Sequence, residues 1–292
     1  MSDSDHRETG DTLPEPKIRP APEADGLTPL LLLHGLGMSA RVWDPVRAGL
    51  GTHHDVVAHT ILGHRGGAPA PKRPVVVDEF VDDVERMLDT VGISRPHVAG
   101  NSLGGWVAIE LARRGRALSV CALSPAGAWH AGTTEQTLGV RKIRRALRSA
   151  RFGRGCGISL ALRSGVVRRL VFRDVAEHGN RLSAAQAMSA VDDLLGCDVI
   201  DDILSTDEEL ALLDPLPCPV TLAWSGDDAI VPLAVNGAVA RARLPGARFV
   251  VLAGVGHVPM IDNPQQVIAV ILQTIRDARR SAASSSRLAE DE

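Results

Sequence analysis

Residues 98–106 read Val98-Ala99-Gly100-Asn101-Ser102-Leu103-Gly104-Gly105-Trp106. The pattern G-x-S-x-G predicts a buried strand, a very tight turn with a serine at its tip, and then a helix. The small residues let the chain turn sharply enough to hold the serine oxygen clear of the backbone. A serine hydroxyl is a poor nucleophile at neutral pH, so a reactive Ser102 would need a base and an oxyanion site from elsewhere in the chain.

Composition sets broad limits on the molecule. The chain has 292 residues, 45% of them hydrophobic and 23% charged, with a net charge of −3, as is typical of a globular protein with a large core. The charge balance gives no reason to expect nucleic-acid binding, and no apolar run is long enough for a membrane span. The N-terminus lacks the pattern of a secretory signal, and the four cysteines match neither a zinc site nor a redox pair, so we expect a cytoplasmic location.

Short apolar runs alternate with helix-like stretches in two parts of the chain. We expect strands at 30–33, 56–58, 97–100, 118–123, 220–224 and 248–252. We expect helices at 80–91, 103–114, 233–243 and 264–279. Continuous apolar strands separated by helices predict an α/β fold with a mostly parallel, doubly wound sheet.

The alternation breaks off near Trp129, and about 75 mainly helical residues follow without a convincing strand. The predicted organisation is therefore a core of residues 25–128 and 206–280, interrupted by a helical cap at 129–205. Residues 1–24 are polar, charged and rich in proline, and we expect a disordered tail there. Residues 281–292 are rich in serine and charge, and we expect a flexible C-terminal tail.

Two segments at predicted strand ends supply what a nucleophilic serine needs. The first, Leu33-His34-Gly35-Leu36-Gly37, follows the first strong strand, and its glycines let an amide N–H point at a developing oxyanion. The N–H groups of Leu36 and Leu103 are the predicted oxyanion hole. The second, Gly256-His257-Val258-Pro259, places one of ten histidines in a glycine-flanked loop after the last strand.

An acidic pair, Asp227 and Asp228, follows the strand at 220–224. A carboxylate there would hold the His257 imidazole in the required tautomer and stabilise its charged form. Two adjacent aspartates do not both point at one histidine, and the residues alone leave the choice between them open. The chain order of serine, aspartate and histidine is nevertheless the order of one particular hydrolase architecture.

These motifs together resemble the α/β-hydrolase fold family over roughly residues 28–280. The resemblance rests on His34-Gly35-Leu36-Gly37, Gly63-His64-Arg65-Gly66, Gly100-Asn101-Ser102-Leu103-Gly104-Gly105, Asp228-Ala229-Ile230-Val231-Pro232 and Gly256-His257-Val258-Pro259. The family's register, counted from Trp224, implies that Asp228 is the acid, and the family implies that the helical insertion covers the active site. The sequence departs from the family in its short polar N-terminal segment, where a β-hairpin is usual, and in having no tyrosine.

The resemblance implies acyl transfer to water, with Ser102, Asp228 and His257 as the catalytic residues and a small ester or related acyl compound as substrate. No metal or cofactor is expected. Carbon–carbon bond hydrolases share the wording Gly-Asn-Ser-Leu/Met-Gly-Gly and are the first alternative, although their oxyanion loop is usually longer. A second alternative, from a different class, is a non-catalytic ligand-binding protein on the same scaffold. The sequence does not indicate an oligomeric state.

The predicted cap is divided by charge. Eleven Lys or Arg residues and no acid lie between Arg141 and Arg173, whereas the later half is acidic at positions 192, 193, 198, 201 and 202. One interpretation is that the basic half attracts an anionic substrate. We favour the simpler interpretation, that the basic and acidic halves pair with each other and with solvent.

Overall fold

The computed structural model describes residues 27–290. Its centre is a six-stranded sheet in the order β2-β1-β3-β4-β5-β6, and all five pairings are parallel. The strands are β1 (Pro29–Leu33), β2 (Asp55–His59), β3 (His97–Asn101), β4 (Ser119–Leu123), β5 (Val220–Ser225) and β6 (Arg248–Leu252). Each lies within two residues of its predicted bounds, and the predicted α/β class with a parallel, doubly wound sheet is confirmed.

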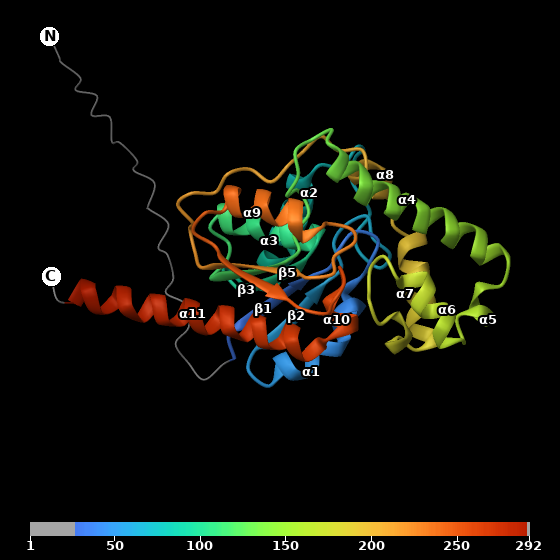
Figure 1. Cartoon of the computed structure of the whole chain (residues 1–292). Coiled ribbons are helices and arrows are strands. Elements are labelled where there is room, and N and C mark those ends of the chain that lie inside the picture. The colour runs from blue at the N-terminus through green and yellow to red at the C-terminus, as the bar shows by residue number, and fades with distance from the viewer. Residues whose placement is uncertain (1–26, 291–292) are drawn as a thin grey trace, which may run out of the picture.

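Helices cover both faces of this sheet (Figure 1). One face packs on α1 (Asp44–Gly51) and α11 (Pro264–Glu290), and the other on α2 (Val77–Thr90), α3 (Leu103–Arg113) and α9 (Ala238–Arg243). Strand β1 shows why. Leu30 and Leu32 pack on the side of α1 and α11, while Leu31 and Leu33 pack on the side of α2 and α3. Because successive side chains of a strand point to opposite faces, a run of four leucines suits a strand buried on both sides.

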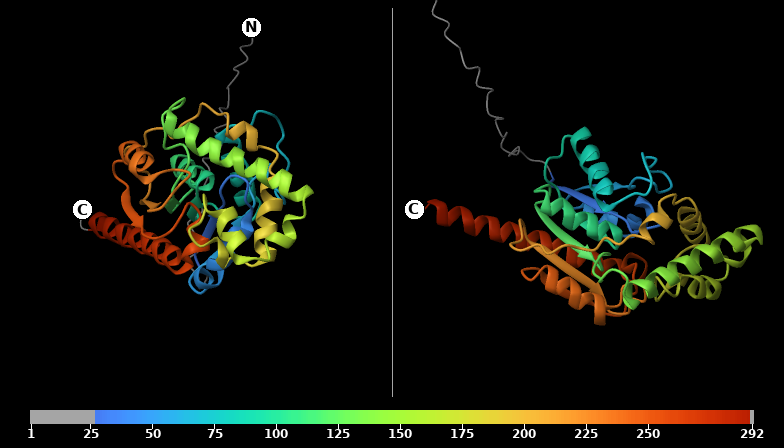
Figure 2. Two further views of the ribbon diagram at one scale, coloured as in Figure 1. Left: turned by 45° about the vertical axis from the view of Figure 1, so that its right-hand side comes forward. Right: turned by 90° about the horizontal axis from the view of Figure 1, so that it is seen from above.

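The insertion between β4 and β5 is helical throughout its regular elements. They are α4 (Thr134–Gly155), α5 (Ile158–Ala161), α6 (Gly165–Phe172), the short 3-10 helix η2 (Gly179–Arg181), α7 (Ala184–Leu195) and α8 (Ile200–Ile203). Figure 2 shows these helices gathered to one side of the sheet, at the end where the strands finish. Among the described residues, no helix combines the length and apolar character needed to cross a bilayer.

The structure differs at several places from the helix boundaries predicted from the sequence. Helix α11 continues to Glu290, beyond its predicted end at residue 279, and so includes residues 281–290 of the expected C-terminal tail. The reason is that this segment contains no glycine or proline to end the helix, and its alanines favour it. Helix α1 and the 3-10 helix before it, η1 (Ala40–Trp43), were not expected. The predicted tail at 1–24 lies outside the described residues.

Two further short helices complete the core. The chain after β5 forms a π-helix, η3 (Leu233–Gly237), that runs into α9, and the histidine loop after β6 leads into α10 (Pro259–Asp262). The predicted single helix at 233–243 is thus two joined segments.

Acid sensitivity is expected from a buried histidine at the start of β3. Burial lowers the pKa of His97 to about 4, while its Nδ1 lies 2.8 Å from the Ser119 hydroxyl. The unfolded chain takes up a proton near pH 6.5 and the folded chain only near pH 4, so stability falls as the pH drops through this interval, by up to about 3 kcal/mol. Urea unfolding at pH 8, 6 and 5 should show that His97→Asn loses part of this dependence. The exposed His130→Asn serves as control, and equal pH slopes in both variants and the parent would contradict the assignment.

Candidate active site

The turn at Ser102 has the strained backbone that its sequence predicts. Ser102 has φ +54°, a value that non-glycine residues seldom adopt, and it directly precedes α3. A Cβ on Gly100 would lie 2.0 Å from the Gly104 carbonyl oxygen, and one on Gly104 would lie 2.3 Å from the Leu33 carbonyl oxygen. Only glycine fits at these two positions, which explains how the chain reverses so closely between β3 and α3.

An aspartate and a histidine from two other loops form a buried pair beside this turn. Asp228 follows β5 and His257 follows β6, and Asp228 Oδ2 lies 2.8 Å from His257 Nδ1. The other oxygen, Oδ1, accepts the backbone N–H groups of Ile230 (2.9 Å) and Val231 (2.8 Å). These two bonds fix the carboxylate, which in turn favours a proton on Nδ1 and leaves Nε2 as the basic nitrogen. Asp227, by contrast, is exposed.

Ser102 is joined to the histidine loop through its neighbour Asn101. The Asn101 side-chain amide donates to the His257 carbonyl oxygen at 2.9 Å and to the Leu123 carbonyl oxygen at 3.3 Å. Both Ser102 and His257 are buried. Within the described residues their side chains are not hydrogen-bonded to each other, a bond that often tightens only when substrate is present. The sequence did not single out Asn101 as a positioning residue.

The predicted oxyanion loop passes directly over the serine. A Cβ built on Gly35 would lie 3.2 Å from the Ser102 Cβ, so the residue before Leu36 is in close contact with the turn. Leu103 is the first residue of α3, and the N–H groups of a first helical turn have no partner within the helix. The positions of both predicted donors are therefore compatible with an oxyanion site.

His34 braces this loop as a neutral side chain. Its Nδ1 lies 2.8 Å from the Gly35 carbonyl oxygen, and its Nε2 accepts the Ile61 N–H at 3.0 Å. Burial, and next the neighbouring His64, hold the His34 pKa well below its usual range. Since an imidazolium could not accept from Ile61, the neutral form is the one that ties the loop after β1 to the loop after β2.

A second buried carboxylate, Asp262, holds the histidine loop against the insertion. Its side chain accepts backbone N–H groups from Gly256 (2.8 Å), Glu177 (3.0 Å) and His178 (2.7 Å). Asp262 therefore fixes the residue before His257 and couples it to the segment that follows α6. The sequence signal was an acid five residues after the histidine, and it was overlooked.

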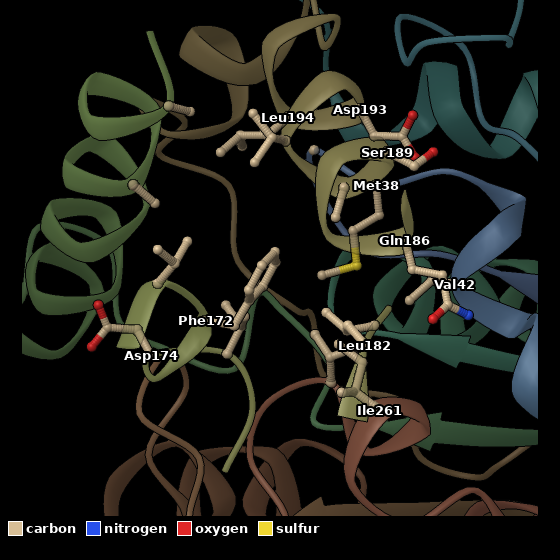
Figure 3. A pocket seen from close by; sticks show the side chains of 18 of the residues that line it. Met38, Val42, Phe172, Asp174, Leu182, Gln186, Ser189, Asp193, Leu194 and Ile261 are labelled. Carbon is tan, nitrogen blue, oxygen red and sulfur yellow. The ribbon is translucent and has the colours of Figure 1, made fainter. Parts of the chain in front are cut away.

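A cavity of about 720 Å³ lies between the insertion and the core, next to the predicted catalytic residues. Its lining includes the predicted oxyanion donor Leu36, and also Ile230 and Val258, which lie within two residues of Asp228 and His257 in the sequence. Ser102 and His257 do not themselves line it. Figure 3 shows Phe172 and Met38 approaching the space from opposite sides, with Leu182 and Ile261 beside them. The lining is mainly apolar, so the cavity suits an apolar part of a ligand.

Acidic residues of the insertion fasten it to the core rather than only to its basic half. Buried Asp193 in α7 accepts the Ser39 hydroxyl at 2.6 Å, Arg41 at 2.5 Å and Arg65 at 3.0 Å. Asp202 likewise bonds to Arg73 of the core. The expected pairing within the cap does occur between Arg154 and Asp192. The sequence did not reveal the core partners, because they lie more than 120 residues away.

Removing the Asp193 carboxylate should loosen the cap. Asp193→Ala leaves the buried Ser39 hydroxyl without its acceptor and frees two arginines, and we expect a loss of about 1–3 kcal/mol in the free energy of unfolding. Asp192→Ala, which removes a more exposed pair on the same helix, should cost less than about 1 kcal/mol. Thermal unfolding of both variants checks this. Equal losses would show that Asp193 is not the main attachment.

Residues that could hold a metal ion do not cluster. Across residues 27–290, no group of three or more histidine, cysteine, aspartate or glutamate side chains is arranged to bind one. The four cysteines are all free, and burial raises the pKa of Cys121 to about 12, so its thiol is protonated and unreactive.

Comparison with known proteins agrees with this architecture. Residues 30–270 match the model of the alpha/beta hydrolase family. The chain is 32% identical to epoxide hydrolase EphH of Mycobacterium tuberculosis over 202 residues, covering 68% of this chain and 94% of that protein.

Two solved structures share the fold. A 2-hydroxy-6-oxo-6-phenylhexa-2,4-dienoate hydrolase from Rhodococcus sp. strain RHA1 has a TM-score of 0.67 at 20% identity, covering 86% of this chain and 91% of its own. A thermophilic esterase from Thermogutta terrifontis has a TM-score of 0.65 at 21% identity, covering 87% and 91%. The family match, which spans most of the chain, establishes that this protein belongs to the alpha/beta hydrolase family.

Proposed function

We propose that this hydrolase cleaves a carboxylic ester, or a related acyl compound, through an acyl-serine intermediate. The observation that carries the proposal is the 2.8 Å bond between Asp228 and His257 beside a serine held at φ +54°. A serine on such a turn, with a carboxylate-oriented imidazole nearby, is the arrangement that activates a hydroxyl for attack on a carbonyl carbon.

In the proposed first step, His257 Nε2 removes the Ser102 proton as Oγ attacks the carbonyl carbon. Asp228 stabilises the imidazolium that forms, through its bond to Nδ1. The Leu36 and Leu103 N–H groups hold the negative oxygen of the tetrahedral intermediate, and such a donor contributes about 2.7–4 kcal/mol. His257 then protonates the leaving alcohol, and water hydrolyses the acyl-serine by the reverse route.

The name of the relative from M. tuberculosis raises epoxide opening as a possible activity for this chain. The mechanism that proceeds through an alkyl-enzyme ester requires a carboxylate as nucleophile, and this chain has Ser102 at the turn. This difference is why we propose ester rather than epoxide hydrolysis.

Carbon–carbon bond hydrolysis is the second candidate. It is favoured by one observation, the sequence motif Gly-Asn-Ser-Leu-Gly-Gly at the turn, which that group of hydrolases shares. A panel of p-nitrophenyl acetate, butyrate, octanoate and palmitate, together with styrene oxide and a dienone substrate, separates the activities.

The apolar cavity leads us to expect butyrate or octanoate to exceed acetate in kcat/KM by at least about tenfold. Turnover of styrene oxide or of the dienone without ester turnover would overturn the proposal.

A further inference from the structure

The outer end of the insertion carries an unusual group of exposed apolar side chains. Phe152 on α4 is 75% exposed, Leu160 on α5 70%, Val166 on α6 80% and Leu170 on α6 60%. We call the last turn of α4 with α5 and α6, residues 151–173, the cap tip. Single exposed apolar residues are ordinary, but several in one small region bordered by charge mark a site of interaction.

The spacing within α6 places apolar and basic residues on one face. Val166 and Leu170 are four residues apart, and Arg169 and Arg173 lie three and seven residues after Val166. Residues at these spacings share a side of a helix. All four are exposed. The outer face of α6 and its C-terminal end therefore carry apolar and cationic side chains next to each other.

The positive charge of this region is largely unneutralised. The stretch from Arg141 to Arg173 has eleven basic residues and no acid, in a chain whose net charge is −3. Arg145 and Arg154 pair with Asp174 and Asp192. Other guanidinium groups are exposed and make no hydrogen bond or ion pair with any described residue; these include Arg148, Arg151, Arg163 and Arg169.

The cap tip is also placed where a flat surface could reach it. Figures 1 and 2 show α4, α5 and α6 at an extremity of the molecule, away from the free end of α11. The described segments leave Leu160 on α5 and Val166 and Leu170 on α6 exposed.

We propose that the cap tip docks on an anionic lipid surface, with its apolar side chains entering the interface and its arginines contacting lipid phosphates. Such surfaces bind helices that combine an apolar face with basic residues, and each nearby arginine adds to the attraction. A second copy of this chain would bring the same positive charges together. A nucleic acid would find a single exposed aromatic ring at the tip, Phe152, on which to stack bases.

Docking in this way would turn the cavity toward the lipid. Leu170 is exposed at the cap tip and also lines the cavity. Ile158 and Phe172, which are partly buried, line the cavity with it. An apolar chain leaving the lipid surface would therefore meet apolar side chains that also line the cavity. This last step rests on the proposed ester hydrolysis, whereas docking itself requires no reactive serine.

The test is co-sedimentation of the full chain with vesicles of phosphatidylcholine alone or containing 30% phosphatidylglycerol. We expect at least tenfold stronger binding to the anionic vesicles at low salt and a marked loss in 0.5 M NaCl. The double variants Val166→Ser/Leu170→Ser and Arg148→Gln/Arg169→Gln should each weaken binding at least fivefold. The controls, Leu212→Ser and Arg47→Gln, replace exposed residues away from the cap tip and should bind within twofold of the parent.

Three results would overturn docking. They are equal binding to both vesicle types, cap-tip variants that bind like the parent, and controls that weaken binding as much as the cap-tip variants. A parent dimer that Val166→Ser/Leu170→Ser converts to monomer in light scattering would instead assign the face to a second copy. Measuring vesicle binding with Ser102→Ala keeps the two proposals separate, since docking should persist there even if no ester is ever hydrolysed.

Discussion

Ester hydrolysis will fall by at least about 10⁴-fold in kcat when Ser102 is replaced by alanine, measured with the best p-nitrophenyl ester. In the proposed mechanism the Oγ atom forms the acyl intermediate, and alanine has no atom to take its place. Binding energy and the oxyanion donors would remain, so a small residual rate above background is expected.

The fold should survive this substitution. Ser102 makes its structural contacts through the backbone: its N–H donates to the Leu123 carbonyl oxygen at 2.9 Å, and its own carbonyl accepts from Ala126 at 3.0 Å. The melting temperature of Ser102→Ala should therefore match that of the parent within a few degrees. Ser94→Ala, at an exposed serine, is the control and should retain full activity. A Ser102→Ala protein with more than a tenth of the parent activity would rule out the serine mechanism.

The second large effect is expected at Asp228. In Asp228→Asn the side-chain oxygen can still accept the Ile230 and Val231 N–H groups, which turns the amide nitrogen toward His257. An N–H donor there favours the tautomer with the proton on Nε2, which cannot take the serine proton. We expect kcat to fall by about 10⁴-fold with little change in KM.

The neighbouring Asp227 is a matched control for this change. It differs from Asp228 in being exposed. Its backbone N–H donates a hydrogen bond to the Val255 carbonyl oxygen at 3.1 Å, and Asp227→Asn leaves that bond in place. Asp227→Asn should keep kcat within about threefold of the parent. A large loss in Asp227→Asn together with a small one in Asp228→Asn would reverse the assignment of the acid.

Local sequence patterns predicted the core because each strand is a short apolar run with clear borders. Leu30–Leu33 and residues 97–100 are buried on both faces, so periodicity and length sufficed to place them. The turn at Ser102 was predictable for a different reason. Neighbouring backbone atoms lie so close to Gly100 and Gly104 that a side chain at either position would collide with them. The choice of Asp228 needed the family register, since nothing local separates it from Asp227.

The contacts that the sequence missed join residues far apart in the chain. Asp262 was not recognised because its partners include Glu177 and His178, 84 or more residues earlier. Asp193 was assigned to a solvated acidic stretch, whereas the fold buries it against Ser39 and two arginines of the core. Such carboxylates look like surface residues until the packing of the insertion is known.

The central claim is that folding turns Ser102 into an activated nucleophile, and covalent labelling tests it without knowledge of the substrate. A fluorophosphonate probe incubated with the intact protein should give one adduct per chain, located by peptide mass spectrometry at Ser102. Labelling should be absent in Ser102→Ala and at least about a hundredfold slower in Asp228→Asn. A correctly folded parent protein that gives no adduct, or an adduct at a residue other than Ser102, would contradict the account.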